Sequence, residues 1–248
     1  MIYFRVAGAM AVAGALRFFL SSVLPLEALH VEVHGVAAYL TVVGGLYGIV
    51  VAFLLFVVWE QFNHVQMGLE KEASALEDLC RVAGFLAERD SGNRIRLALR
   101  RYVKVTESDE PQRLAARQAS AIACESFAAL KQAVRGAEVP TQKDRVVYDE
   151  LLRALARVME ARDERLTVSA TRVPETLWNM VVFVSVVVLF GGFLALGVHS
   201  VWLAILLVAA AGGILTFLLA VIKDMDNPFA GVWNVSYAPM TDVASRVG

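Results

Sequence analysis

Carboxylates that could act in catalysis occur as pairs in the middle of the sequence. Glu70/Glu72 and Asp163/Glu164 supply the residue type that general acid–base catalysis needs. Each pair lies in a charged run typical of an exposed helix face, so we predict that these carboxylates are solvated. The sequence contains no nucleophile elbow, P-loop, dinucleotide fingerprint or zinc-protease helix. We therefore expect no catalytic residues, and we predict that the protein is not an enzyme.

A second group of polar side chains lies near the N-terminus. His30 and His34 are spaced to place two imidazoles on one helix face, and Glu27 and Glu32 lie beside them. Two imidazoles can bind a divalent metal, but this set is too small to predict a metal site. In a channel, the four residues would line an outer vestibule and tune the local ion concentration.

Oxygen-bearing side chains form a third group at Asp224, Asp226 and Asn227. Carboxylate and amide oxygens are ligands that Ca²⁺ prefers. Two aspartates are few for a cation site, and Asn227-Pro228 is equally typical of a helix stop. A cation site and a structural turn are therefore both open, and Ca²⁺ is the one cofactor candidate in a chain predicted to need none.

The chain that carries these groups is too apolar for an ordinary soluble domain, with 58% hydrophobic residues and a mean hydropathy of +0.59. Val36–Trp59 contains no charged residue and is long enough to cross a bilayer as a helix. The charge-free stretch Leu177–Ile222 is long enough for two spans, about Thr176–Leu196 and Val201–Ile222, separated by a Gly-Val-His-Ser turn.

The first apolar segment is interrupted by Arg17, and a charge near mid-span is unfavourable. A cleaved signal peptide and a re-entrant segment are alternatives, but we predict a first span over about Tyr3–Leu24. Four spans then place the N-terminus, residues 61–173 and the C-terminus on the same side. The turn between the last two spans has no lysine or arginine, whereas residues 61–173 have 19. The positive-inside rule therefore predicts that all three face the cytoplasm, as in an inner-membrane protein.

The middle of the chain shows helical periodicity throughout. We predict that the second span continues as one helix to about Ser91-Gly92, across a tolerated Gly68. Its apolar stripe, which includes Leu76, is predicted to form a subunit interface. Further helices are predicted over 93–106, 112–135 and 141–169. The predicted divisions are two spans (1–60), a cytoplasmic helical domain (61–173), two spans (174–222) and a C-terminal segment (223–248).

Glycines crowd the second span, where Gly44, Gly45 and Gly48 fall close together. Small residues let helices approach closely in lipid, so close packing between helices is their simplest role. The formal net charge of -1 gives no general attraction to nucleic acid. The predicted fold is thus all-α, with four spans and long helices that extend into a cytoplasmic helical domain.

Short motifs in a fixed order around these spans resemble the bestrophin-like family of bacterial and plant membrane proteins. They cover most of the chain and consist of Tyr47, Phe53 and Trp59, then Glu72-Ala73 and Leu76, then Arg165-Leu166, Val173-Pro174, Thr176-Leu177-Trp178, and Asp226-Asn227-Pro228-Phe229 with Gly231. The family is distantly similar to the bestrophin ion channels, which are pentamers with four spans per subunit and a pore lined by the second span.

The resemblance implies a homo-oligomer, with a pentamer favoured, that conducts inorganic ions passively across the bilayer. Ile49 and Phe53 match the hydrophobic neck of bestrophins, and Gly45 lies one turn outward of them. Val57 continues the same face, and Glu60 and Gln61 would begin a polar inner mouth. The acidic Ca²⁺ clasp of bestrophins is absent, because Ala230-Gly231-Val232-Trp233 stands in its place.

A different class of function is also open, namely a non-conducting scaffold or sensor whose cytoplasmic helices bind a partner. The two hypotheses differ in the second span. A channel needs one face of this helix left unpacked, whereas a scaffold would bury every face. Residues 61–173 carry 19 basic and 17 acidic side chains, so charge does not decide the sign of a conducted ion.

Overall fold

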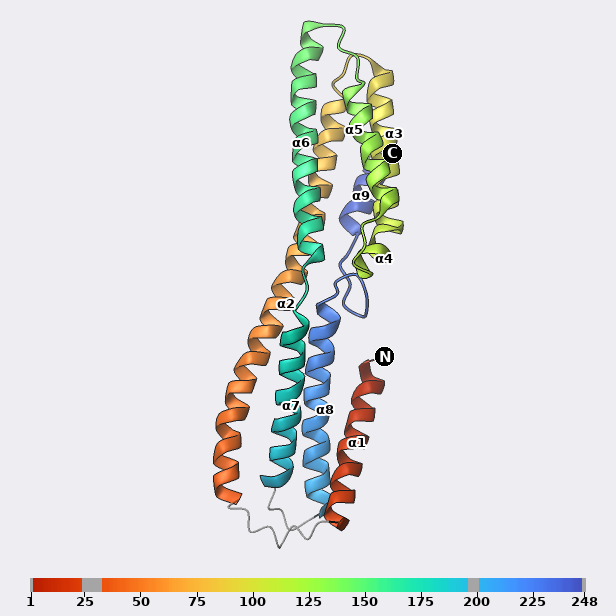
Figure 1. The fold of residues 1–248 in the computed structure, drawn as a ribbon. Coiled ribbons are helices and arrows are strands. Elements are labelled where there is room, and N and C mark those ends of the chain that lie inside the picture. Colours follow the sequence, from red (N-terminus) through yellow and green to blue (C-terminus); the bar gives the residue numbers. More distant parts are fainter. Residues whose placement is uncertain (1, 24–32, 196–200, 247–248) are drawn as a thin grey trace. The chain divides into compact units, whose positions relative to one another are not determined.

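The computed structural model describes residues 2–23, 33–195 and 201–246, and the regular structure within these ranges is α-helical (Figure 1). The helices are α1 (Ile2–Val23), α2 (Val33–Ala83), α3 (Arg89–Ser108), α4 (Glu110–Ala115), α5 (Ala121–Arg135), α6 (Gln142–Ala170), α7 (Glu175–Ala195), α8 (Val201–Met225) and α9 (Ala238–Arg246). The prediction of an all-α fold is confirmed. The chain divides into two compact units, Met1–Trp59 with Val173–Asp226, and Glu60–Arg172 with Asn227–Gly248.

The first unit contains the apolar helices. Among the described residues, α2, α7 and α8 are long and apolar enough to cross a membrane, in agreement with the second to fourth predicted spans. Helix α1 lies alongside α8 (Figure 1). A Cβ added at Gly213 would lie 2.7 Å from Met10 Cγ, and one added at Gly14 would lie 3.5 Å from Ile205 Cγ2. These two glycines therefore permit the close approach of α1 and α8.

A polar contact joins α2 to α7 inside this unit. The Tyr47 hydroxyl lies 2.5 Å from Ser185 Oγ, and both residues are buried. Ser185 Oγ donates its own hydrogen to the Val181 carbonyl at 2.7 Å, so Tyr47 is the donor to Ser185. This hydrogen bond helps fix the rotation of α2, because it turns Tyr47, and with it Val51 and Leu54, toward the other helices.

The second unit has its own hydrophobic core. The apolar stripe of α2 continues into this core through Val65, Leu69, Leu76 and Leu79, which are all buried. Its partners come from α3, α5, α6 and α9. The predicted role of Leu76 at a subunit interface is therefore wrong, because the chain's own helices cover it completely.

Two helix boundaries differ from the prediction. Helix α2 ends at Ala83 rather than near Ser91-Gly92, and these two residues lie in the first turn of α3. Gly84 directly follows the last residue of α2, and its amide bonds back to the Cys80 and Arg81 carbonyls at 3.2 and 3.1 Å. Beyond it, the Asp144 carboxylate of α6 accepts a hydrogen bond from the Ala87 amide at 3.1 Å. The helix predicted over 112–135 is broken between α4 and α5, where Arg117 adopts a positive φ of 60°.

Side-chain caps begin the next two long helices. Ser120 accepts a hydrogen bond from the Ala123 amide at the start of α5. Thr141 and Asp144 form a reciprocal capping box at the start of α6. Helix α9, which was not predicted, packs Met240 and Val243 into the core of the second unit.

Candidate functional site: an open face of α2 and a buried ion cluster

One face of α2 is left open within the first unit. Ile49 and Phe53 are each 67% exposed, and Gly45 is exposed one turn before them. Val57, on the same face, is half-buried. Because the residues are four apart, their side chains lie above one another along one side of the helix. The sequence therefore placed them correctly on a common face, although the assignment of that face to a pore stays a prediction.

Three glycines in the first-unit part of α2 have no close neighbour either. A Cβ added at Gly44, Gly45 or Gly48 would meet no atom of the described residues within 4 Å. The prediction of close helix packing is therefore wrong for these three within a single chain.

Two further residues were predicted to form the inner mouth. They begin the second unit, where Glu60 is exposed and Gln61 is half-buried. The side-chain oxygen of Gln61, Oε1, is buried and has no hydrogen-bond partner among the described residues.

The residues predicted to line an outer vestibule lie mostly outside the part of the chain that the structure describes. Glu27, His30 and Glu32 lie outside the described residues, and the side chain of His34 does too, although its backbone begins α2. Their role stays a prediction.

The predicted cation-binding oxygens of Asp226 and Asn227 have protein partners. Within the first unit, Asp226 Oδ1 accepts a hydrogen bond from the Val173 amide at 2.8 Å. Within the second unit, the Asn227 amide donates to the Ala115 carbonyl at 3.2 Å and accepts from Arg172 at 3.3 Å. In the described part of the chain no three His, Cys, Asp or Glu side chains are grouped to hold a metal. Cation binding with Asp224 stays a prediction.

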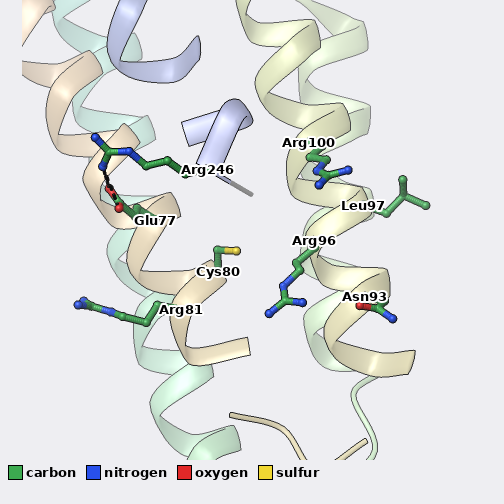
Figure 2. A pocket seen from close by; sticks show the side chains of 8 residues that line it. All are labelled: Glu77, Cys80, Arg81, Asn93, Arg96, Leu97, Arg100 and Arg246. Carbon is green, nitrogen blue, oxygen red and sulfur yellow. Dashed lines mark hydrogen bonds and ion pairs between the residues drawn. The ribbon is translucent and has the colours of Figure 1, made fainter. Parts of the chain in front are cut away.

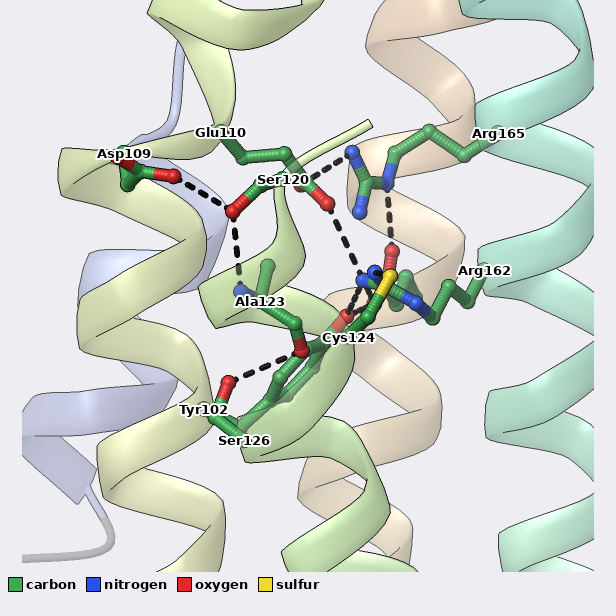
Figure 3. Close-up of polar contacts among 10 residues, drawn as sticks. Tyr102, Asp109, Glu110, Ser120, Ala123, Cys124, Ser126, Arg162 and Arg165 are labelled. Carbon is green, nitrogen blue, oxygen red and sulfur yellow. Dashed lines mark hydrogen bonds and ion pairs between the residues drawn. The ribbon is translucent and has the colours of Figure 1, made fainter. Parts of the chain in front are cut away.

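The second unit contains a cluster of buried charges that we call the ion cluster, made up of Glu72, Tyr102, Glu110, Arg162 and Arg165. Figure 3 labels Tyr102, Glu110, Arg162 and Arg165 of this cluster. The five residues come from four helices, α2, α3, α4 and α6. Two carboxylates face two guanidinium groups, so their formal charges cancel.

Arg165 lies between the two carboxylates. Its Nε donates to Glu72 Oε2 at 2.5 Å, and its Nη1 lies 2.8 Å from Glu110 Oε2. Burial opposes the positive charge of Arg165, but Glu72 and Glu110 together raise the pKa of its guanidinium above the ordinary value. Arg165 is therefore charged in the folded protein.

Arg162 and Tyr102 complete the cluster. Arg162 Nη1 lies 3.2 Å from Glu110 Oε1 and donates a hydrogen bond to the Tyr102 hydroxyl. Tyr102 in turn donates to Glu72, and burial raises the pKa of its hydroxyl well above the ordinary value. Tyr102 therefore stays protonated and serves as a hydrogen-bond donor to the carboxylate.

The ion cluster corrects the prediction that Glu72 is solvated, because its side chain is completely buried. A sequence signal for this burial existed. Glu72 lies three residues after Leu69 and four before Leu76, which places it on the apolar stripe of α2. Arg162 and Arg165 are likewise three apart on one helix face. Such a cluster can hold helices in one arrangement.

The sequence matches the bestrophin-like domain over residues 6–240. This chain belongs to the bestrophin-like family. Together with its three apolar helices, family membership makes it a membrane protein. No curated protein matches the sequence.

Solved structures share the fold of this bestrophin-like protein. A bacterial bestrophin homologue from Klebsiella pneumoniae, phased with zinc, is 13% identical with a TM-score of 0.72, and the match covers 100% of this chain and 96% of that one. A single-residue variant of that homologue is 12% identical with a TM-score of 0.74, over 99% and 97% of the two chains. At this identity the likeness shows the fold.

Residues from different family motifs contact one another in the structure of this bestrophin-like protein. Glu72 pairs with Arg165, from two motifs far apart in the sequence. Asp226, directly after α8, accepts a hydrogen bond from the backbone of Val173, just before α7. The short motifs thus mark residues that contact one another.

Proposed function

We propose that this bestrophin-like protein assembles as a homo-oligomer, with a pentamer favoured, and conducts ions passively through a central pore lined by α2. Helix α1 is proposed to cross the membrane in addition to α2, α7 and α8, which gives four spans. The second unit, the N-terminus and the C-terminus are all proposed to face the cytoplasm, with the protein in the inner membrane. Family membership supports the class of function.

The observation that carries the proposal is the open face of α2. Gly45, Ile49 and Phe53 are uncovered by the chain itself, as a pore-lining face must be within one subunit. Other apolar helices also have exposed residues, and the resemblance of α2 to the pore-lining second span of bestrophins selects α2 among them. Rings of such apolar side chains around an axis can close a narrow pore by dewetting. We assign Ile49 and Phe53 to this constriction, and Glu60 to its polar inner end.

The test is ion flux into liposomes that contain the purified protein. Replacing Ile49 and Phe53 together with Ala should increase flux relative to the wild type, because a wider and wetter neck lowers the barrier. The matched control replaces Ile214 and Phe217 with Ala, which removes the same residue types from exposed positions on α8. The control should leave flux unchanged.

Two results would contradict the proposal. If the α2 variant is folded and oligomeric but gives no more flux than empty liposomes, α2 does not line a conducting pore. If both variants increase flux equally, the increase is a leak caused by weakened packing. In the first case the scaffold hypothesis, in which the second unit binds a partner, is favoured.

A further inference from the structure

The outer face of α6 carries a row of apolar side chains. Leu152, Ala156 and Met159 follow one another at intervals of four and three residues, and Leu166 continues the row two turns after Met159. Leu152 and Met159 are 38% and 37% exposed, and the side chains that α6 contributes to the core come from other positions. Alternating intervals of three and four are typical of a helix that packs along a second helix. We call this face the α6 row.

The unpaired charges beside the α6 row are negative. Glu160 and Asp163 are exposed, and neither forms an ion pair within the described part of the chain. The other exposed charges between Leu152 and Leu166 have partners, in the pairs Arg153–Glu150, Arg157–Glu150 and Glu164–Lys71. The α6 row is therefore an apolar surface with two free carboxylates.

The outer face of α3 has the opposite charge around one apolar side chain. Arg94, Leu97, Arg101 and Lys104 are three, four and three residues apart, which places them in one row along the helix, and residues 91–106 contain no carboxylate. Leu97 is 70% exposed, and Figure 2 shows its side chain extending from α3 away from α2. Arg101 and Lys104 are exposed and form no ion pair with any described residue. We call this face the α3 row.

The two rows complement each other but cannot meet within one chain. Helices α3 and α6 turn other residues toward their shared core, Leu99 and Val103 from α3 and Leu155 and Val158 from α6. Figure 1 shows the two helices on opposite sides of the second unit, with α5 between them. A contact between the rows therefore needs two copies of the chain.

We propose that the α6 row of one copy packs against the α3 row of the next copy. Leu97 enters the apolar row, and the aliphatic stems of Arg101 and Lys104 cover it while their charged ends reach Glu160 and Asp163. This inference rests on the proposed homo-oligomer and names the surfaces that join its second units. Because the two rows differ, the contact is heterologous, and its repetition around an axis closes a ring in which every row is covered.

The test is cysteine cross-linking of the full-length protein in detergent, with Cys80 and Cys124 replaced by Ser. A variant that carries both Leu97→Cys and Met159→Cys is treated with a flexible bis-maleimide. The products should form a ladder that extends above the dimer on a denaturing gel, because each copy supplies one cysteine to each of two contacts. The matched control combines Leu97→Cys with Arg157→Cys, which lies at the same height on another side of α6, and it should give at least about tenfold less product.

Single-cysteine variants test the symmetry of the contact. Leu97→Cys alone and Met159→Cys alone should each run as a monomer on the gel. A dimer formed by Met159→Cys alone would mean that two α6 rows meet around a two-fold axis. That result would overturn the proposal, as would equal ladders from the test pair and the matched control.

Charge reversal tests the polar part of the contact, at exposed positions outside the core. In the cross-linking background, replacing Arg101 and Lys104 with Glu should lower the yield of the ladder by at least about fivefold, because like charges then face one another. Replacing Glu160 and Asp163 with Lys in the same chain should restore the yield. A loss without restoration would contradict the pairing of these charges and overturn the proposal.

Light scattering of the same samples separates this inference from the proposed channel. A stable oligomer that gives no ladder overturns the contact between the rows and leaves the proposed pore in place. A monomer would instead overturn the homo-oligomer, and with it the proposed function.

Discussion

Arg165 Nε and Glu72 Oε2 lie 2.5 Å apart on α6 and α2, and both side chains are completely buried. The pair joins two helices whose residues are far apart in the sequence. Glu110 and Arg162 add a second carboxylate and a second guanidinium group in contact with this pair, so the four formal charges sum to zero. Removal of any one of these four charged side chains therefore leaves an unpaired charge in the core of the second unit.

Glu72→Gln should destabilise the protein by about 3–5 kcal/mol, because a buried positive charge loses its partner. Thermal unfolding in detergent, followed by circular dichroism, measures the effect. The control is Glu70→Gln, two residues earlier on the exposed side of α2, which should change stability by less than about 0.5 kcal/mol. Equal effects of the two substitutions would contradict the buried cluster.

Gly68 should resist any side chain, because a Cβ there would lie 3.1 Å from Arg165 Cβ and 3.3 Å from its Cα. Gly68→Val should therefore destabilise the protein by about 1–3 kcal/mol through overpacking, and more than Gly68→Ala does. Gly44→Ala, at an open position of the same helix, is the control and should be neutral or stabilising. If Gly68→Val is as stable as the wild type, α2 and α6 do not approach as described.

The capping box of α6 should make stability depend on pH. The hydrogen bond from Thr141, together with that from the Ala87 amide, lowers the pKa of Asp144. The deprotonated form is thus favoured in the folded state, and its stabilising contribution is present above the unfolded pKa of about 3.9. The contribution is lost as pH falls through the lower folded pKa.

Melting temperatures of the wild type and Asp144→Ala should therefore differ near pH 7 and converge as pH is lowered toward 3. Asp149→Ala, on the exposed side of the same helix, should show no such gap. A gap for Asp144→Ala that is constant over this pH range would contradict the role of its charge.

The proposed topology predicts which side of the membrane each cysteine label reaches. The background for labelling is a variant with Cys80 and Cys124 replaced by Ser, so that it contains no native cysteine. Into this background Gln118→Cys is introduced, because Gln118 is exposed between α4 and α5. A membrane-impermeant maleimide added to intact cells should label Ser200→Cys and should leave Gln118→Cys unlabelled until the membrane is broken. Labelling of both in intact cells would contradict the four-span topology.

The sequence by itself determined the apolar helices, because charge-free stretches long enough to span a bilayer have few other structures open to them. It also placed Ile49 and Phe53 on one face of α2, because the helical repeat fixes that relationship within a single element. The start of α6 was predicted close to its true position, because its cap is formed by neighbouring residues, Thr141 and Asp144.

Tertiary structure alone decided the contacts between distant segments. Glu72 was predicted to be solvated because its neighbours are charged, yet its partner Arg165 lies on another helix and keeps it buried. The hydrogen bond between Ala87, after the end of α2, and Asp144 of α6 likewise joins residues far apart in the sequence, and no local pattern encodes it. Two glycines of the same helix also have opposite surroundings. Arg165 of α6 lies against Gly68, whereas no described residue lies within 4 Å of a Cβ added at Gly44.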